Sequence, residues 1–147
     1  MNNANSLFLT YTSHSCLETE KIGQTFAKSL KPGDFIALCG DLGAGKTAFT
    51  RGLAKVLSPE DRIASPTYTI VQEYQLPGSV RLYHMDLYRI ADAGSALGFG
   101  VDEFIDDPKA FKLIEWPERI ESLLPEKCVT VEITHKGDEE RELRVSR

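Results

Sequence analysis

The segment from residue 40 to residue 47 contains the residues whose chemistry is easiest to assign. It reads Gly-Asp-Leu-Gly-Ala-Gly-Lys-Thr and matches G-x-x-x-x-G-K-[ST] at every fixed position. Its glycines allow a tight turn in which main-chain N–H groups point at phosphate oxygens. In such a loop Lys46 bridges a β- and a γ-phosphate, and the Thr47 hydroxyl ligates Mg²⁺. The segment therefore predicts a site for a nucleoside triphosphate with Mg²⁺.

The neighbouring sequence supports this interpretation. The alternative is that the segment is a glycine-rich turn with an exposed lysine and no ligand. An apolar run, residues 35–39, precedes the loop and is typical of a buried strand. Apolar residues at helical spacing follow it as far as residue 57, and the N-terminus of such a helix favours anions. The candidate nucleotide-binding residues of the segment are Gly40, Asp41, Leu42, Gly43, Ala44, Gly45, Lys46 and Thr47.

Two acidic residues could complete the site, because a P-loop needs a carboxylate near Mg²⁺ and a group that orients water. Glu115 follows a second apolar run, residues 111–114, and Asp86 ends an extended run that begins at residue 80. Ligands of open α/β sheets bind at the carboxyl ends of strands. Both acids are therefore candidates, although each could instead be a surface carboxylate just beyond a strand.

Other residues are less specific. A hydroxyl within residues 65–69 could sense the γ-phosphate, but from the residues alone a plain turn is the better interpretation. Trp116 could cover the site, although a lone tryptophan is more often part of a core, and His84 is interpreted as structural. The sequence His-Lys-Gly-Asp at 135–138 differs at its first position from the [N/T]-K-x-D sequence that reads guanine. ATP is therefore favoured over GTP.

Composition limits the classes of protein to which the chain can belong. With 147 residues, of which 41% are hydrophobic, the chain fits a single domain over residues 1–147. Its net charge of −5 argues against binding nucleic acid by bulk charge. Three widely spaced cysteines favour a reducing compartment, and the sequence shows no signal peptide or membrane-length apolar run. A cytoplasmic protein is expected, with no contact to a membrane.

The hydrophobic pattern predicts an α/β arrangement of elements around the glycine-rich loop. Ser15 and Glu18 form a capping-box pattern at the start of the first helix, and Pro77-Gly78 supplies a turn between two extended runs. The predicted elements are a helix over residues 16–30, a strand over 35–39, a helix over 46–57, a hairpin over 67–74 and 80–86, a helical turn over 101–105, a strand over 111–114, a short helix over 117–124 and a hairpin over 128–134 and 142–146. The rest of residues 91–109 shows little periodicity.

Four motifs in succession resemble one bacterial family. They are the glycine-rich loop, Ser65–Thr69 (SPTYT), Tyr83–Arg89 (YHMDLYR) and Leu113–Pro117 (LIEWP). Their order and spacing are similar to those of the TsaE family, the ATPase subunit of the bacterial machinery that makes tRNA threonylcarbamoyladenosine. The resemblance covers about residues 15–125. It implies a P-loop NTPase fold in which a central, mainly parallel sheet carries antiparallel hairpin additions.

The resemblance also implies roles for individual residues. It implies weak ATP hydrolysis that depends on Lys46, with Mg²⁺ held by Thr47 and Glu115. It implies support for hydrolysis from Asp86 and Thr67.

Further contacts to the nucleotide follow from the same resemblance. Trp116 is expected near the nucleotide. Adenine is expected near residues 13–16 and 136–141, where Ser15 and Arg141 are the candidates.

The resemblance implies partners as well. They are the threonylcarbamoyl transferase subunit and its non-catalytic paralogue (TsaD- and TsaB-like), with tRNA reached indirectly through the complex. The modification would lie at position 37 of tRNAs that read ANN codons. Residues 91–97 depart from the family pattern, which puts a local helix and any partner contact there in doubt.

Two other functions fit the same loop. A small-molecule P-loop kinase would need a lid and an acceptor pocket, and no arginine-rich lid is evident in the sequence. A nucleotide-gated binding module would need ATP only to order a docking surface, without turnover.

Overall fold

Seven strands form one sheet in the computed structural model, which describes residues 8–41, 43–57 and 70–146. The strands are β1 (Phe8–Ser13), β2 (Phe35–Cys39), β3 (Val71–Gln75), β4 (Arg81–Asp86), β5 (Ala110–Glu115), β6 (Val129–His135) and β7 (Arg141–Ser146). Their order across the sheet is β1-β7-β6-β2-β5-β4-β3.

The centre of the sheet is parallel and both of its edges are antiparallel. Strands β6, β2, β5 and β4 pair in parallel, whereas β7 and β1 extend one side and β3 the other in antiparallel pairs. Strands β2 and β5 are the apolar runs of the sequence, and every residue of β5 is buried, as expected for strands covered on both faces. The predicted P-loop NTPase fold, with antiparallel hairpins added to a mainly parallel sheet, is therefore confirmed.

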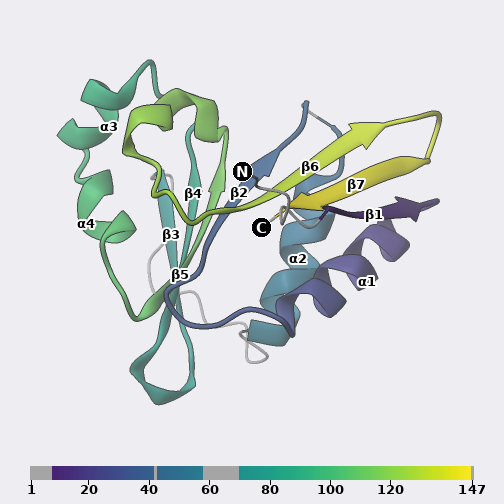
Figure 1. Ribbon diagram of the computed structural model, residues 1–147, viewed down its shortest axis with the longest axis horizontal. Helices are drawn as coiled ribbons and strands as arrows, with labels where there is room; N and C mark the ends of the chain where they lie inside the picture. Colours follow the sequence, from purple (N-terminus) through teal and green to yellow (C-terminus); the bar gives the residue numbers. More distant parts are fainter. Residues whose placement is uncertain (1–7, 42, 58–69, 147) are drawn as a thin grey trace, which may run out of the picture.

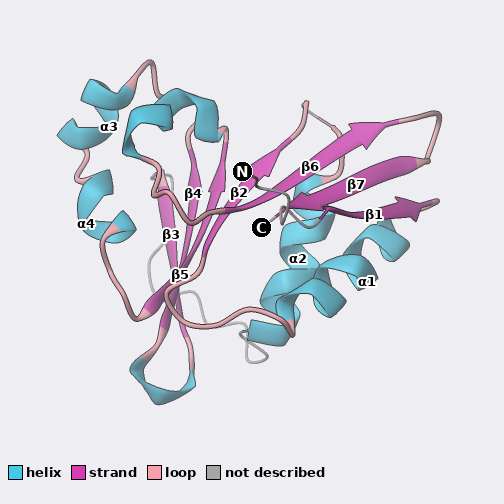
Figure 2. Ribbon diagram, in the orientation of Figure 1, coloured by secondary structure: helices cyan, strands magenta, loops and turns pink. Residues whose placement is uncertain are grey.

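Helices cover both faces of the sheet (Figures 1 and 2). Helices α1 (Cys16–Ala27) and α2 (Lys46–Leu57) lie together on one face, and α3 (Ala93–Gly98) and α4 (Val101–Ile105) lie on the other. Two short 3₁₀ helices, η1 (Pro77–Ser79) and η2 (Pro117–Leu123), follow β3 and β5. None of the helices in the described ranges is both long enough and apolar enough to cross a bilayer.

Helices α1 and α2 approach each other closely through glycines. A Cβ atom on Gly52 of α2 would lie 1.9 Å from the main-chain oxygen of Glu20, and one on Gly23 of α1 would lie 2.4 Å from that of Phe49. Only glycine permits so short a distance between two helix backbones. This contact fixes the position of α2, and with it the position of the loop that precedes α2.

The first helix differs in detail from its prediction. The Ser15 side chain accepts a hydrogen bond from the Glu18 N–H, as a capping box requires, but the Glu18 carboxylate accepts from the N–H of His14 rather than of Ser15. The helix ends at Ala27 instead of residue 30, because the next main-chain bonds span three residues rather than four.

Two elements were not predicted. Helix α3 lies within residues 91–109, where its glycines weaken the helical pattern. It forms because the Asp92 side chain caps the N–H of Ser95 and because Ala96 is buried in the core. Strand β1 depends on pairing with β7, which comes from the other end of the chain.

Candidate functional site

The glycine-rich loop joins β2 to α2, as the motif requires. Gly43 and Gly45 have φ values of +80° and +114°, in the left-handed region that favours glycine. Helix α2 begins at Lys46, directly after the loop, so the helix N-terminus lies at the end of the loop, where it favours anions. Leu42 lies outside the described residues.

A cavity of about 350 Å³ opens beside the loop. Seven residues singled out in the sequence line it together: Gly43, Gly45, Lys46, Thr47, Asp86, Glu115 and Trp116. They come from three different segments of the chain and meet because β4 and β5 end at the same edge of the sheet. Thr67 lies outside the described residues.

A second cavity, of about 200 Å³, lies on the other side of the loop. Ser15 and Thr19 of the α1 N-terminus form one wall, and Asp138 and Arg141 of the β6–β7 turn form another. Cys16 and Gly45 line both cavities. The two spaces therefore meet at the loop, and a ligand that extends from one to the other would cross it.

Lys46 is buried beside its own loop. Its Nζ donates a hydrogen bond of 2.6 Å to the main-chain oxygen of Gly40 and lies 4.0 Å from the centroid of the Trp116 ring. An ammonium group over an indole face is attracted by the ring's quadrupole. The carbonyl and the ring thus hold the charge of Lys46 at the inner end of the cavity.

Trp116 has an unusual backbone conformation at the carboxyl end of β5. Its φ and ψ angles are 62° and 51°, in the left-handed region, where a bulky residue is strained. Its half-buried ring contacts the Tyr88 ring at a centroid distance of 5.1 Å and also lines the cavity. The side chain thus packs against the core and faces the site, which combines the two interpretations made from the sequence.

The two carboxylates lie side by side. Asp86 is opposite Glu115 in the parallel register of β4 and β5. Asp86 is exposed and accepts a hydrogen bond of 3.0 Å from the Tyr88 N–H, whereas Glu115 is buried. Both acids therefore lie at the carboxyl ends of neighbouring parallel strands, at one edge of the sheet.

His84 contacts Glu115, which the sequence did not indicate. The distance between His84 Nε2 and Glu115 Oε2 is 2.6 Å. With the ring proton on Nε2, this contact is a hydrogen bond that His84 donates to the Glu115 carboxylate. The alternation of His84 with Asp86 was the available signal, because residues two apart on a strand share a face.

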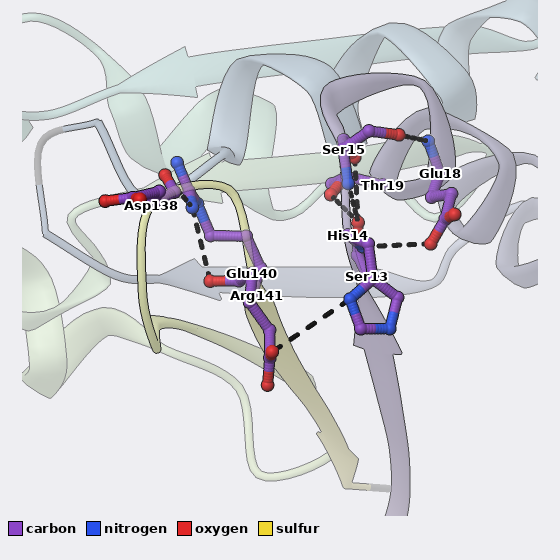
Figure 3. Close-up of polar contacts among 8 residues, drawn as sticks. All are labelled: Ser13, His14, Ser15, Glu18, Thr19, Asp138, Glu140 and Arg141. Atoms are coloured by element: carbon purple, nitrogen blue, oxygen red, sulfur yellow. Dashed lines mark hydrogen bonds and ion pairs between the residues drawn. The ribbon is translucent and has the colours of Figure 1, made fainter.

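Arg141 contacts the main chain of the loop. Its Nε donates a hydrogen bond of 2.9 Å to the Ala44 oxygen, and its Nη2 lies 3.4 Å from the Gly43 oxygen. Figure 3 shows this arginine with Asp138 and Glu140 on one side of the second cavity, opposite the N-terminus of α1. The family resemblance predicts Arg141 near adenine but does not predict its contact with the loop, whose residues are 97 and 98 positions away in the chain.

A hydrogen-bond network shapes the opposite wall of the second cavity. The hydroxyls of Ser13 and Thr19 are 2.7 Å apart, and Ser13 Oγ also donates to the Ser15 oxygen at 2.8 Å. His14 Nδ1 lies 4.0 Å from Glu140 Oε1, so this pair links the wall to the β6–β7 turn (Figure 3). Ser15 lines the cavity, but its hydroxyl caps helix α1.

The donor atoms of the first cavity fit Mg²⁺. Thr47, Asp86 and Glu115 supply hydroxyl and carboxylate oxygens to the same space. Magnesium prefers oxygen ligands and is usually bound by one or two carboxylates together with substrate phosphates. The residues present therefore match the ion implied by the loop motif.

Comparison with known families identifies the group of proteins to which this arrangement belongs. The family model described as "Threonylcarbamoyl adenosine biosynthesis protein TsaE" matches residues 13–143, which is most of the chain. The chain belongs to the TsaE family. The resemblance noted in the four sequence motifs is thereby confirmed.

The chain aligns with individual TsaE proteins over most of their length. The chain is 44% identical over 126 residues to the Bacillus subtilis tRNA threonylcarbamoyladenosine biosynthesis protein TsaE, covering 86% of this chain and 77% of that protein. It is 37% identical over 134 residues to the Treponema pallidum protein of the same name, covering 91% and 97%. A crystal structure of Bacillus subtilis YdiB superposes with a TM-score of 0.77 at 36% identity, covering 98% of this chain and 88% of that one.

Proposed function

We propose that this TsaE-family chain binds ATP with Mg²⁺ at the glycine-rich loop and hydrolyses it slowly. Hydrolysis would support a complex that forms threonylcarbamoyladenosine at position 37 of tRNAs reading ANN codons. The observation that carries the proposal is the shared cavity in which Lys46, Thr47, Asp86 and Glu115 meet. The names of the relatives support its place in tRNA modification.

Each residue of the cavity has a proposed task. Lys46 donates to the β- and γ-phosphates, and the loop amides bind the remaining phosphate oxygens. Thr47 and Glu115 would hold Mg²⁺, which when bound neutralises charge on those oxygens. Asp86, the more exposed acid, orients the attacking water. Thr67 is proposed to assist in this step.

The base would occupy the second cavity. Its walls carry the Ser15 and Arg141 candidates and the acidic residues Asp138 and Glu139 of the β6–β7 turn. Arg141 would act mainly by holding the Gly43 and Ala44 carbonyls, so that the loop amides stay turned toward the phosphates. Trp116 would face the phosphate end of the nucleotide.

The proposed partners are the threonylcarbamoyl transferase subunit and its non-catalytic paralogue, with tRNA held by the complex rather than by this chain. The net charge of −5 supports indirect contact, because phosphate backbones are bound by basic surfaces. The expected cytoplasmic location is part of the same proposal.

The test is ATP hydrolysis by the purified protein, alone and with both partner subunits and tRNA. Slow hydrolysis alone, with a changed rate in the complex, is the expected result. Glu115→Gln should abolish both hydrolysis and tRNA modification. If modification continues while hydrolysis is lost, the chain acts as a nucleotide-gated binding module. Phosphate transfer to a metabolite faster than to water would instead indicate a kinase.

A further inference from the structure

His84 contacts Glu115, a proposed ligand of Mg²⁺, and the proposed function gives His84 no task. Its Nε2 lies 2.6 Å from Glu115 Oε2, and the two side chains are only 15% and 11% exposed. A hydrogen bond from a ring N–H to a carboxylate is charge-assisted, and it is stronger where water is largely excluded. The contact is therefore a buried part of the folded chain.

The register of the sheet explains why these two side chains meet. His84 shares a strand face with Leu82 and Asp86, because alternate residues point the same way. On the neighbouring strand, Leu113 and Glu115 share the same face, and both leucines are buried in the cluster that includes residues of α1 and α2. His84 is opposite Leu113, two residues before the Asp86–Glu115 pair. It thus approaches Glu115 diagonally, on the face that carries the glycine-rich loop.

The two acids are held in different ways. Glu115 is bound through Oε2 by the His84 ring, whereas Asp86 accepts a hydrogen bond from the Tyr88 main chain at the mouth of the site. Binding one oxygen of a carboxylate fixes the direction of the other. Groups that orient a metal ligand in this way typically affect metal affinity or activity by about 10- to 100-fold.

We propose that His84 is a positioning residue, which donates through Nε2 to Glu115 and holds that carboxylate in the direction needed to bind Mg²⁺. This inference rests on the proposed function. His84 itself touches neither the nucleotide nor the ion. Its effect should therefore be confined to steps that depend on Mg²⁺, and it should disappear when Glu115 is changed.

The test compares His84→Leu with His84→Gln, which keeps an N–H donor. The fluorescence of Trp116, the single tryptophan of the chain, reports ATP binding without Mg²⁺ and then the Mg²⁺ titration of the ATP complex. His84→Leu should weaken Mg²⁺ binding about tenfold and leave Mg²⁺-free ATP binding within twofold. His84→Gln should restore most of the lost affinity.

Gln72→Leu is a matched control, because Gln72 is opposite His84 on β3 and replacing it leaves the Glu115 contact in place. It should leave both affinities unchanged. In a Glu115→Gln background, His84→Leu should cause no further loss. Thermal unfolding of every variant shows whether a loss of affinity reflects a loss of folded protein.

The proposal is overturned if His84→Leu binds Mg²⁺ as wild type does, if the leucine and glutamine variants are equally impaired, or if His84→Leu is additive with Glu115→Gln. These outcomes leave the proposed function intact, provided that wild type binds and hydrolyses ATP. If wild type takes up no nucleotide, the proposed function fails first, and the role of His84 fails with it.

Discussion

At the scale of single residues, the position of Lys46 beside Trp116 should allow nucleotide binding to be followed by fluorescence. The ammonium lies over the Trp116 ring and donates one of its three N–H groups to the Gly40 oxygen, so a phosphate bound by the other N–H groups would lie close to the ring. Trp116 fluorescence should therefore change when ATP with Mg²⁺ is added. Adenosine, which has no phosphate to attract Lys46, is the control and should leave the signal almost unchanged. An equal response to adenosine would contradict this account of Lys46.

The cysteines provide a second test at the residue scale. Burial raises the pKa of the Cys39 thiol from 9.0 to about 11, so near pH 8 its thiolate fraction is about 100-fold below that of an ordinary thiol. Cys16 is exposed and lines both cavities. Mass spectrometry after brief labelling should find Cys16 modified first and protected by ATP with Mg²⁺, with Cys39 modified only as pH rises toward 11. Labelling of Cys39 as fast as Cys16 at pH 8 would be inconsistent with the structure.

At the scale of elements, the contact between α1 and α2 is predicted to determine stability. Gly52→Ala would place a Cβ atom 1.9 Å from the Glu20 oxygen, so the helices must separate. The expected cost is about 1–3 kcal/mol in the free energy of unfolding, measured by denaturant titration. Gly98→Ala is the control, because nothing lies within 4 Å of a Cβ atom at that helical glycine. It should change stability by less than about 1 kcal/mol, and an equal effect of the two changes would refute the packing argument.

Strand β7 is predicted to affect nucleotide binding through its first residue. Arg141→Gln removes donors to the Ala44 and Gly43 carbonyls. ATP affinity should fall by about tenfold, in line with the loss of a charged hydrogen bond. Arg81→Gln, which removes a surface ion pair with Glu73, is the matched control and should bind ATP as wild type does. Unchanged affinity in Arg141→Gln would show that the loop keeps its shape unaided.

Elements that are determined by neighbouring residues could be predicted from the sequence, whereas elements that depend on distant contacts could not. Strands β2 and β5 are continuous apolar runs, and α2 follows a motif with fixed spacing, so short windows of sequence identify them. Helix α3 is short and contains glycines, and it depends on one cap and one buried alanine. Strand β1 depends on a partner at the far end of the chain. Such tertiary determinants are not visible in a local pattern.

At the scale of the whole molecule, residues from separate segments of the chain lie together at one edge of the sheet. The sequence predicts Lys46, Thr47, Asp86 and Glu115 as site residues because each follows a motif or ends a strand, and the structure brings them together. It does not predict that His84 would reach the neighbouring strand. A diagonal contact depends on strand register, which is determined only when the sheet assembles.

Calorimetric titration of the folded, purified protein with ATP and Mg²⁺ tests the central claim most directly. The claim is that main-chain amides of the loop, Lys46 and a Thr47-bound ion together hold a triphosphate. We predict saturable uptake of one nucleotide per chain, and a loss of at least tenfold in affinity in Lys46→Ala, with unfolding curves showing that the variant is folded. The account is contradicted if wild type takes up no nucleoside triphosphate, even with its proposed partners, or if Lys46→Ala binds equally well.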